Sequence, residues 1–234
     1  MQVAILAGGL ATRLGSLTRG QPKSMVRVHG RPFLEYQLEN LSHDGVRDVV
    51  LCIGHLGEQI EERFEDGRRF GVNIKYSHEG ERLLGTAGAL KNAVRLLDSE
   101  FFVMYGDSYL FLDYNAIMTY FKGHNKLGLM VVYQNRDLYD KSNVMAENGI
   151  VKGYSKSKKS DTMIYIDYGA SILRKETLEL VPSDEIYSLE NLFASLVEHG
   201  ELLAYEVYDR FYEIGSPQGL REFEKYISER KGSG

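Results

Sequence analysis

The residues best suited to chemistry in this 234-residue chain lie in a glycine-rich loop near its beginning. An apolar run at residues 3–6 leads into the string Leu6-Ala7-Gly8-Gly9-Leu10-Ala11-Thr12-Arg13-Leu14, and Lys23 follows in Gln21-Pro22-Lys23. Adjacent glycines let a backbone approach a ligand closely and leave N–H groups free to face phosphate oxygens. Because Arg13 would add a planar fork for phosphate and Lys23 a compact charge, the segment predicts a phosphate-binding loop.

The glycine pair taken alone has a simpler interpretation, a turn with Arg13 on the surface. The Walker string Gly-x4-Gly-Lys-Ser/Thr and the string Gly-x-Gly-x-x-Gly are both absent from the sequence. We therefore expect neither a P-loop kinase nor a standard dinucleotide-binding fold.

A second candidate for chemistry is Tyr105-Gly106-Asp107, which ends an apolar run at residues 101–105. A carboxylate at a strand end, beside a phosphate loop, is where a hard cation would bridge phosphate oxygens. On its own a Gly-Asp pair is more often a turn. Asp107 is thus a candidate metal ligand if the phosphate-binding loop lies beside it, and a turn residue otherwise.

Hydrophobic periodicity predicts the elements that hold these residues. In the first half strands and helices alternate, which favours right-handed crossovers and a parallel sheet covered on both faces. Ligands in such sheets bind at the carboxyl ends of the strands, where the glycine-rich loop must lie. Strands are predicted at 3–6, 48–53, 73–76 and 101–105, and helices at 32–41, 56–64 and 86–97.

After residue 113 the pattern changes to mostly strands, and Asn148-Gly149 is a strong hairpin signal. We expect one α/β domain over residues 1–230, a three-layer sandwich around a mixed, mostly parallel Rossmann-like sheet. The second half would add antiparallel pieces over the sheet edge. Residues 231–234 are expected to form a tail outside this domain. Strands are predicted at 127–133, 144–146, 150–154, 164–173, 202–207 and 211–214, and helices at 189–197 and 217–228.

Composition excludes several classes of function. The formal net charge of −5 disfavours a nucleic-acid polymer as partner, because that affinity needs a basic face. The six histidines lack metal-ligand spacing, so no zinc site is expected, and Cys52 in its apolar run predicts a buried, inert thiol. No signal-like start and no apolar run of about 18 residues occurs, so we expect no membrane contact and a cytoplasmic protein.

The full string from Leu6 to Leu14, with the later Pro22-Lys23, resembles the signature of the sugar-1-phosphate nucleotidylyltransferases, the NDP-sugar pyrophosphorylases. The resemblance extends from about residue 2 to residue 226 and implies the nucleotide-diphospho-sugar transferase fold. It implies transfer of a nucleotidyl group from a nucleoside triphosphate to a sugar 1-phosphate, with Mg²⁺ as cofactor and pyrophosphate as second product. It also implies a nucleotide-binding half at 1–112 and a sugar-binding half at 113–230. The implied catalytic residues are Arg13, Lys23 and Asp107, and the implied phosphate-loop contacts are Leu6, Ala7, Gly8, Gly9 and Thr12.

Two further segments resemble the family's base-recognising and metal-binding motifs. Leu84-Gly85-Thr86-Ala87-Gly88-Ala89-Leu90, with Glu79 before it, implies that Glu79, Gly85, Thr86 and Gly88 contact base and ribose. Glu81 is close enough to compete with Glu79, and Gly85-Thr86 also suits a helix start. The segment Phe211–Pro217 implies Glu213 as a second metal ligand beside Asp107, although relatives carry the shorter Asp there.

Three segments resemble the family's sugar-phosphate contacts. Lys156 stands where relatives have Glu-Lys-Pro and would bind the sugar phosphate, although Lys158 and Lys159 could substitute. Asp167-Tyr168-Gly169-Ala170 resembles the Asn-Ala-Gly or Asn-Gly-Gly segment, with Gly169 lining the sugar pocket and Tyr168 adding bulk. Ser188-Leu189-Glu190 implies that Glu190 accepts hydrogen bonds from sugar hydroxyls.

The expected substrate pair depends on which branch of the family the chain resembles. The chain looks most like the heptose- and hexose-1-phosphate guanylyltransferase branch, so GTP with heptose or mannose 1-phosphate is the first expectation. UTP- or CTP-dependent hexose-1-phosphate transfer stays open, as does a non-catalytic regulatory subunit that binds an NDP-sugar. A metal-dependent glycosyltransferase is a further alternative, although such enzymes usually carry Asp-x-Asp where this chain has Gly106-Asp107-Ser108. Relatives are often dimers or tetramers, which makes a homo-oligomer an expectation.

Overall fold

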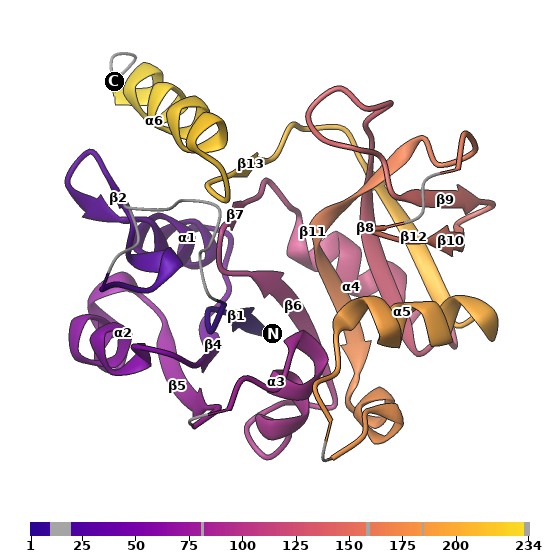
Figure 1. Cartoon of the computed structure of the whole chain (residues 1–234), viewed down its shortest axis with the longest axis horizontal. Coiled ribbons are helices and arrows are strands. Elements are labelled where there is room, and N and C mark those ends of the chain that lie inside the picture. Colours follow the sequence, from indigo (N-terminus) through magenta and orange to yellow (C-terminus); the bar gives the residue numbers. More distant parts are fainter. Residues whose placement is uncertain (10–19, 81, 158–159, 184, 232–234) are drawn as a thin grey trace.

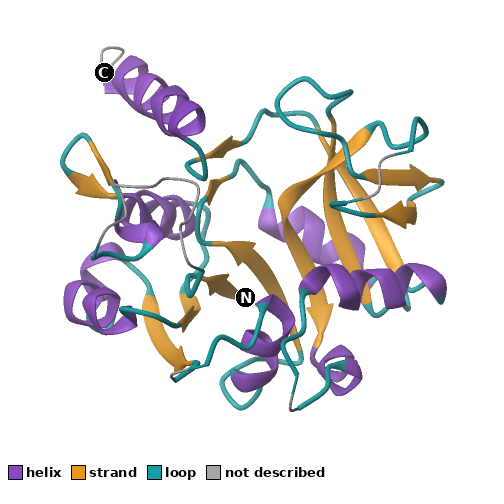
Figure 2. Cartoon of the chain, in the orientation of Figure 1, coloured by secondary structure: helices purple, strands orange, loops and turns teal. Residues whose placement is uncertain are grey.

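The computed structural model describes residues 1–9, 20–80, 82–157, 160–183 and 185–231. One large sheet runs through this part of the chain, with helices packed against it (Figure 1; Figure 2). Its nine strands lie in the order β5-β4-β1-β6-β11-β8-β12-β10-β9. The prediction of an α/β fold with a mixed sheet is confirmed.

Four parallel strands form the first half of the sheet. They are β5 (Asn73–His78), β4 (Asp48–Ile53), β1 (Gln2–Leu6) and β6 (Glu100–Tyr105). Ile5 on the central strand β1 is in register with Leu51 on one side and Met104 on the other. The carboxyl ends of β1 and β6 therefore lie side by side, as the strand–helix alternation predicts.

In the second half of the sheet, one prediction was wrong. β11 (Tyr165–Arg174) runs inside the sheet, antiparallel to both β6 and β8 (Gly128–Gln134), rather than over its edge. Most of its residues are buried, because strands flank it on both sides and side chains cover both faces. The rest of this half contains β12 (Leu202–Val207), parallel to β8, then β10 (Ile150–Tyr154), and finally β9 (Val144–Glu147) at the end of the strand order.

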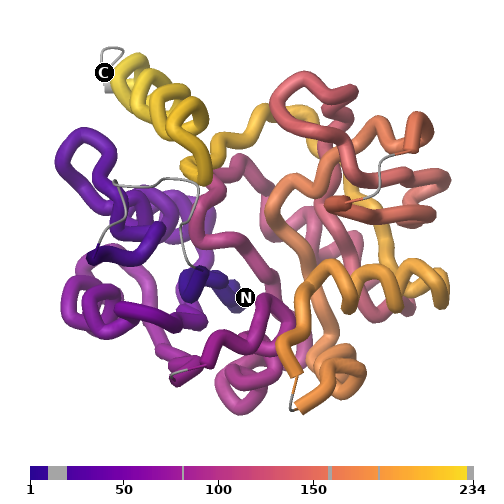
Figure 3. Tube along the Cα trace, in the orientation of Figure 1, coloured from indigo at the N-terminus to yellow at the C-terminus, as the bar shows by residue number. Residues whose placement is uncertain are grey.

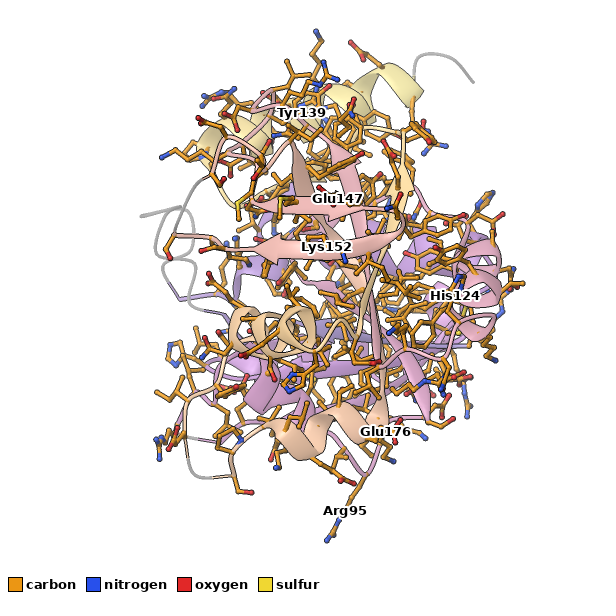
Figure 4. The ribbon with its side chains drawn as sticks, turned by 90° about the vertical axis from the view of Figure 1, so that its right-hand side faces the viewer. Arg95, His124, Tyr139, Glu147, Lys152 and Glu176 are labelled. Carbon is orange, nitrogen blue, oxygen red and sulfur yellow. The ribbon has the colours of Figure 1, made fainter. Side chains whose placement is uncertain are left out.

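Strands β9 and β10 form the predicted hairpin. Asn148 and Gly149 both have positive φ, 51° and 74°, as a tight two-residue turn requires. Figure 4 shows Glu147 on β9 and Lys152 on β10 in this hairpin, with Tyr139 marking the loop between β8 and β9.

Helices contribute to two apolar clusters that use alternating residues of the central strands. The first cluster contains Ile5 and Leu51 together with α1 (Phe33–His43), α2 (Gly57–Phe64) and α4 (Tyr114–Lys122). The second contains Ala4 and Val50 with α3 (Thr86–Asn92) and α5 (Leu189–Glu198). Because strand side chains alternate between faces, the two clusters lie on opposite sides of the sheet.

Helix α4 was missed by the sequence reading, which expected mostly strands after residue 113. Asp113 caps its first turn by accepting a hydrogen bond from the Ala116 N–H. Tyr114, Ile117 and Phe121 are its buried residues, and their spacing is that of one helical face. Helix α3 is shorter than predicted and ends at Asn92.

A third apolar cluster joins the C-terminal helix α6 (Pro217–Lys231) to the beginning of the chain. The ring of Phe223 packs against Phe33 and Tyr36 of α1, with centroids 5.1 and 5.6 Å apart. The cluster also reaches two short ribbons, β2 (Arg27–Val28) with β3 (Arg31–Pro32), and β7 (Ser108–Tyr109) with β13 (Tyr212–Glu213). Figure 3 shows the end of the chain beside the β2–β3 ribbon.

Two expectations concern the surroundings of the chain. Cys52 is fully buried, and burial raises the pKa of its thiol to about 12, which confirms an inert core cysteine. Of the helices that the structure describes, none combines the length and apolar composition needed to cross a bilayer.

Candidate active site

The carboxyl ends of β1 and β6 form the floor of a pocket, called here the strand-end pocket. The Gly106 N–H donates to the Leu6 carbonyl at 3.0 Å, which holds the two loops together. A Cβ on Gly106 would lie 2.8 Å from that carbonyl oxygen, so glycine is required. The described residues that line the pocket are Leu6, Ala7, Gly8, Gly9, Lys23, Ser24, Glu79, Leu83, Gly85, Thr86, Ala89, Tyr105, Gly106 and Asp107.

Gly8 is the most constrained residue of the glycine-rich loop. A Cβ there would meet the Gly54 nitrogen at 3.0 Å and would collide with Oε1 of Glu79. At Gly9, in contrast, a Cβ would meet no atom of the described residues within 4 Å. The first glycine thus lets the loop pass close to its neighbours, and the second leaves the backbone open toward the pocket.

A cation and two carboxylates converge at one end of this pocket. Lys23, on the single 3₁₀ turn Lys23–Met25, forms an ion pair with Asp107 in which the side chains are 17% and 18% exposed. The β7–β13 ribbon places Glu213 opposite Ser108, and the Ile214 N–H donates to the Asp107 carbonyl at 2.9 Å. A Cβ on Gly215 would collide with Oε1 of Glu213 and lie 2.8 Å from Nζ of Lys23. These three charged groups therefore share one small volume.

The side of the strand-end pocket away from Lys23 is formed by Glu79 and the start of α3. Glu79 accepts a hydrogen bond from the Leu84 N–H at 2.8 Å, and burial raises the pKa of its carboxyl group. The Thr86 hydroxyl accepts from the Leu189 N–H at 2.7 Å. The Gly88 N–H donates to the Tyr187 carbonyl at 3.1 Å, so this amide joins two segments of the protein and does not face the pocket.

A second pocket, called here the loop-lined pocket, lies beside the first. Its wall combines the loop between β8 and β9 with segments that follow β10 and β6. The described residues that line it are Tyr105, Asp107, Ser108, Asp140, Lys141, Ser142, Asn143, Ser155, Lys156, Ser157, Ile166, Asp167, Tyr168, Gly169, Phe211 and Glu213. Tyr105 and Asp107 line both pockets, so the two cavities meet at the end of β6.

Lys156 enters the loop-lined pocket on a fixed backbone. Oε1 of Glu190 accepts from the Lys156 N–H at 2.8 Å, and Nζ of Lys156 lies 3.3 Å from the Tyr105 hydroxyl. Gly169 has a φ of 96°, and a Cβ there would lie 3.1 Å from Oγ of Ser108. Lys156 and Gly169 thus line this pocket, whereas Glu190 does not line it and contacts the Lys156 backbone instead.

Tyr168 was expected to add bulk to the sugar pocket. Although it is one of the lining residues, its side chain is 1% exposed and its ring packs against Phe211 with centroids 5.5 Å apart. The Tyr168 hydroxyl accepts a hydrogen bond from the Phe111 N–H at 3.4 Å. Most of this side chain is therefore core.

Several residues of the two pockets were missed by sequence reasoning. Asp140, Lys141 and Asn143 come from the irregular loop between β8 and β9, where Arg136 and Asp137 have positive φ. No turn motif or periodic pattern points to such a loop. Tyr105 stands directly before the Gly106-Asp107 pair, and that position was the signal that could have identified it.

The predicted site residues fall into three groups. Those that line the two pockets are Leu6, Ala7, Gly8, Gly9, Lys23, Glu79, Gly85, Thr86, Asp107, Lys156, Gly169 and Glu213. Gly88 and Glu190 line neither pocket. Thr12, Arg13, Glu81, Lys158 and Lys159 lie outside the described residues.

A metal ion would have two protein ligands here. In the part of the chain that the structure describes, no group of three or more His, Cys, Asp or Glu side chains is placed to hold one. Asp107 and Glu213 nevertheless supply the hard oxygen donors that Mg²⁺ prefers, since this ion often binds one or two carboxylates together with substrate phosphates and water. The donor set fits Mg²⁺ bound jointly by protein and substrate.

Two solved structures resemble this chain over nearly its whole length. HddC from Yersinia pseudotuberculosis, solved in complex with GMP-PN, is 28% identical with a TM-score of 0.81, covering 97% of this chain and 99% of that one. The inositol-1-phosphate CTP transferase from T. maritima, 24% identical with a TM-score of 0.79 over 97% of this chain and 94% of that one, shares the fold. The fold is thus one that solved nucleotidyltransferase structures share.

Sequence relatives identify the family. D-glycero-alpha-D-manno-heptose 1-phosphate guanylyltransferase of Campylobacter jejuni is 31% identical over 224 residues, covering 95% of this chain and 98% of that protein. The mannose-1-phosphate guanylyltransferase catalytic subunit beta of Drosophila pseudoobscura is 30% identical over 92% of this chain and 59% of that protein. The family described as Nucleotidyl transferase matches residues 2–152. The chain belongs to this family.

Proposed function

We propose that the protein transfers a nucleotidyl group from a nucleoside triphosphate to a sugar 1-phosphate, giving an NDP-sugar and pyrophosphate. GTP with heptose or mannose 1-phosphate is the first choice of substrates. The observation that carries the proposal is that two pockets meet at Asp107. Exchange at phosphorus needs two phosphorylated molecules side by side with their charge neutralised, and this junction offers that arrangement.

The division of labour between the two halves of the chain is part of the proposal. The described residues that line the strand-end pocket lie between positions 6 and 107, and those of the loop-lined pocket between 105 and 213. This supports a nucleotide-binding half at 1–112 and a sugar-binding half at 113–230. The apolar clusters on the two faces of the sheet likewise support a three-layer sandwich.

In the proposed reaction, an oxygen of the sugar phosphate attacks the α-phosphorus in line and pyrophosphate leaves. The nucleophile is already an anion, so no general base is needed, and positioning and charge neutralisation supply the acceleration. Lys23, held at the junction by Asp107, would neutralise the charge that develops at the α-phosphate. Arg13 would act on the leaving pyrophosphate.

Asp107 and Glu213 would hold the Mg²⁺ cofactor. When bound, the ion supplies charge neutralisation to the phosphate oxygens. The backbone hydrogen bond between Ile214 and Asp107 keeps the two acids in register, because it ties the β13 segment to the end of β6. Their separation is therefore set by the fold rather than by the metal.

Glu79 supports guanine as the preferred base. The Watson–Crick edge of guanine presents two adjacent N–H donors, which a carboxylate accepts together, whereas uracil presents one donor between two carbonyl groups. One Glu79 oxygen already accepts from Leu84, which fixes the orientation of the carboxylate at the pocket wall. UTP or CTP would form fewer hydrogen bonds with this group.

The direct experiment mixes each of the four nucleoside triphosphates with heptose, mannose and glucose 1-phosphates and measures pyrophosphate release with Mg²⁺. We expect the fastest release from GTP with heptose or mannose 1-phosphate, and its loss in Lys23→Ala. Faster release with UTP or CTP would correct the base. Binding of an NDP-sugar with no release for any pair would instead identify a regulatory subunit and contradict the proposal.

A further inference from the structure

Tyr105 occupies the boundary between the two pockets. It is the last residue of β6, and Gly106-Asp107 follow it into the junction. The Tyr105 side chain lines both cavities, and burial raises the pKa of its hydroxyl well above the ordinary value. A neutral phenol therefore separates the site proposed for the nucleotide from the site proposed for the sugar phosphate.

The Lys156 ammonium group is held against this phenol. Nζ lies 3.3 Å from the Tyr105 hydroxyl oxygen and 4.7 Å from the centroid of the ring. At the other end of the residue, Glu190 fixes the backbone N–H at 2.8 Å. Lys156 is exposed, and a free lysine at the surface would sample many rotamers. The contacts with Tyr105 and Glu190 restrict the Lys156 ammonium group to one region of the pocket.

Beside Tyr105 in the loop-lined pocket lies a partly buried carboxylate, Asp167. Its side chain accepts from the Gly169 N–H at 3.0 Å and from the Tyr154 hydroxyl at 3.2 Å. Burial raises the pKa of Asp167, and the nearby Lys156 charge is the largest effect that opposes this rise. A buried carboxylate needs both hydrogen bonds and a counter-charge, and Lys156 is that counter-charge.

We propose that Tyr105 and Asp167 are positioning residues that hold the Lys156 ammonium group at the boundary of the two pockets, where it meets the phosphate of the sugar 1-phosphate. The inference rests on the proposed function and extends it. Tyr105 accepts one hydrogen bond from Lys156, and Asp167 lines the same pocket with its negative charge close to both. An ammonium group has three donors, so two remain for phosphate oxygens.

A role in positioning makes a prediction that a role in packing does not. If Tyr105 and Asp167 act through Lys156, their substitutions weaken sugar-phosphate binding only while Lys156 is present. They also change the KM for the sugar 1-phosphate and leave the KM for the nucleotide alone, although Tyr105 lines both pockets. Loss of packing at the boundary would disturb both substrates.

The test is a double-mutant cycle of Tyr105→Phe and Asp167→Asn, each with and without Lys156→Ala, on the full chain with Mg²⁺. We expect the sugar-phosphate KM to rise about 10- to 100-fold in Lys156→Ala, because a charge-assisted hydrogen bond is lost. Tyr105→Phe and Asp167→Asn should each raise it roughly 3- to 10-fold alone and less than about 2-fold in the Lys156→Ala background. The nucleotide KM should stay within about 2-fold throughout. Tyr205→Phe is the matched control, since Tyr205 lies on β12 and lines neither pocket.

Three results would overturn the inference: full additivity with Lys156→Ala, equal changes in both KM values, or no change in either. A wild-type protein without pyrophosphate release would contradict the proposed function instead, so the two failures are distinguishable. Thermal unfolding checks each variant for folding. If Asp167→Asn does not fold, Tyr105→Phe and Tyr154→Phe complete the same cycle, because Tyr154 donates to the carboxylate.

Discussion

The two pockets are built in different ways, although they share one boundary. The strand-end pocket depends on main chain and on glycines, among them Gly8 and Gly106, whose neighbours leave no room for a Cβ. The loop-lined pocket depends on side chains such as Lys156, Asn143 and Asp140, which come from segments far apart in the sequence. The comparison suggests that phosphate recognition is encoded locally at strand ends, whereas sugar recognition is assembled by the tertiary fold.

The junction of the two pockets, at Asp107, combines residues from both halves of the chain. Asp107 belongs to both pockets, pairs with Lys23 from the first half of the chain, and lies beside Glu213 from the end of the chain. Changes to the charged groups of the junction, Asp107, Lys23 and Glu213, should therefore affect both substrates, and changes that act within one pocket should affect one. The predictions below follow this rule, from the largest effect to the smallest.

Asp107→Asn should give the largest loss. The substitution keeps the shape but removes a charge that holds Lys23 and would bind Mg²⁺, and loss of one such contact typically lowers kcat roughly 10²–10³-fold. Steady-state kinetics at saturating concentrations of both substrates measures it. Asp98→Asn, an exposed acid outside both pockets, should behave like the wild type. A kcat within 2-fold of wild type, about 0.4 kcal/mol, would remove Asp107 from the reaction.

Gly8→Ala should affect the nucleotide selectively. The new Cβ would collide with Glu79 and crowd Gly54, so the loop must shift and the KM for the nucleoside triphosphate should rise on the order of 10-fold, about 1.4 kcal/mol. Gly9→Ala, whose Cβ meets no atom of the described residues within 4 Å, should have a smaller effect. Equal effects at both glycines would contradict the steric argument. An unchanged KM for the sugar phosphate is part of the prediction.

Gly219→Ala should weaken metal binding although alanine favours helices. In α6 a Cβ at this position would collide with the carbonyl oxygen of Glu213, which would displace the proposed metal ligand. Supporting residues around metal sites typically change affinity about 10- to 100-fold, and we expect the lower end of this range. Electron paramagnetic resonance of Mn²⁺ with a nucleotide analogue measures the affinity directly. The neighbouring exposed Gln218→Ala should leave it unchanged, and unaltered Mn²⁺ affinity in Gly219→Ala would refute the contact.

Asp167→Asn should have a small effect on stability, and its sign should depend on pH. Burial holds the pKa of Asp167 above its ordinary value, so the folded protein binds this proton more tightly than the unfolded chain does. The resulting stability is fully present below the unfolded pKa and is lost as the pH rises through the folded pKa. The asparagine variant lacks this loss, so its Tm relative to wild type should rise as the pH increases above the ordinary pKa of an aspartate, by roughly 2–4 °C for each kcal/mol.

The control for the pH experiment is Asp98→Asn, because Asp98 is exposed and no such burial acts on it. Its Tm difference from wild type should stay flat over the same range. A Tm difference for Asp167→Asn that stays flat, or falls with rising pH, would show that the carboxylate is not destabilised by its surroundings. Differential scanning fluorimetry at matched ionic strength is sufficient for both variants.

Sequence reasoning predicted the first half of the molecule better than the second, because the strand-end pocket is encoded in local strings and the loop-lined pocket is assembled by the tertiary fold. Half of the lining of the strand-end pocket comes from the short strings at the ends of β1 and β6, so chain order gives spatial order there. The position of β11 inside the sheet depends on pairings with β6 and β8, which no local pattern contains. Asp140 and Asn143 enter their pocket through a loop of irregular backbone, and periodicity does not describe such loops.

Glu190 and Gly88 show a subtler limit. Both stand in strings that resemble family motifs, and both lie next to the site, but one fixes the Lys156 backbone and the other binds the Tyr187 carbonyl. A motif therefore identifies a segment that lies near the site. Which of its groups face the cavity depends on how the helix that carries the motif is oriented. Helix α4 was missed for a simpler reason, because residues 114–122 were assigned to no element, although the spacing of Tyr114, Ile117 and Phe121 is that of one helical face.

A crystal structure with a non-hydrolysable GTP analogue, a sugar 1-phosphate and Mg²⁺ tests the central claim most directly. We predict the triphosphate in the strand-end pocket, the sugar in the loop-lined pocket, and the two reacting phosphates on either side of Asp107, with Lys23 contacting the nucleotide. Both ligands in one pocket, or phosphates that meet away from Asp107, would contradict the account.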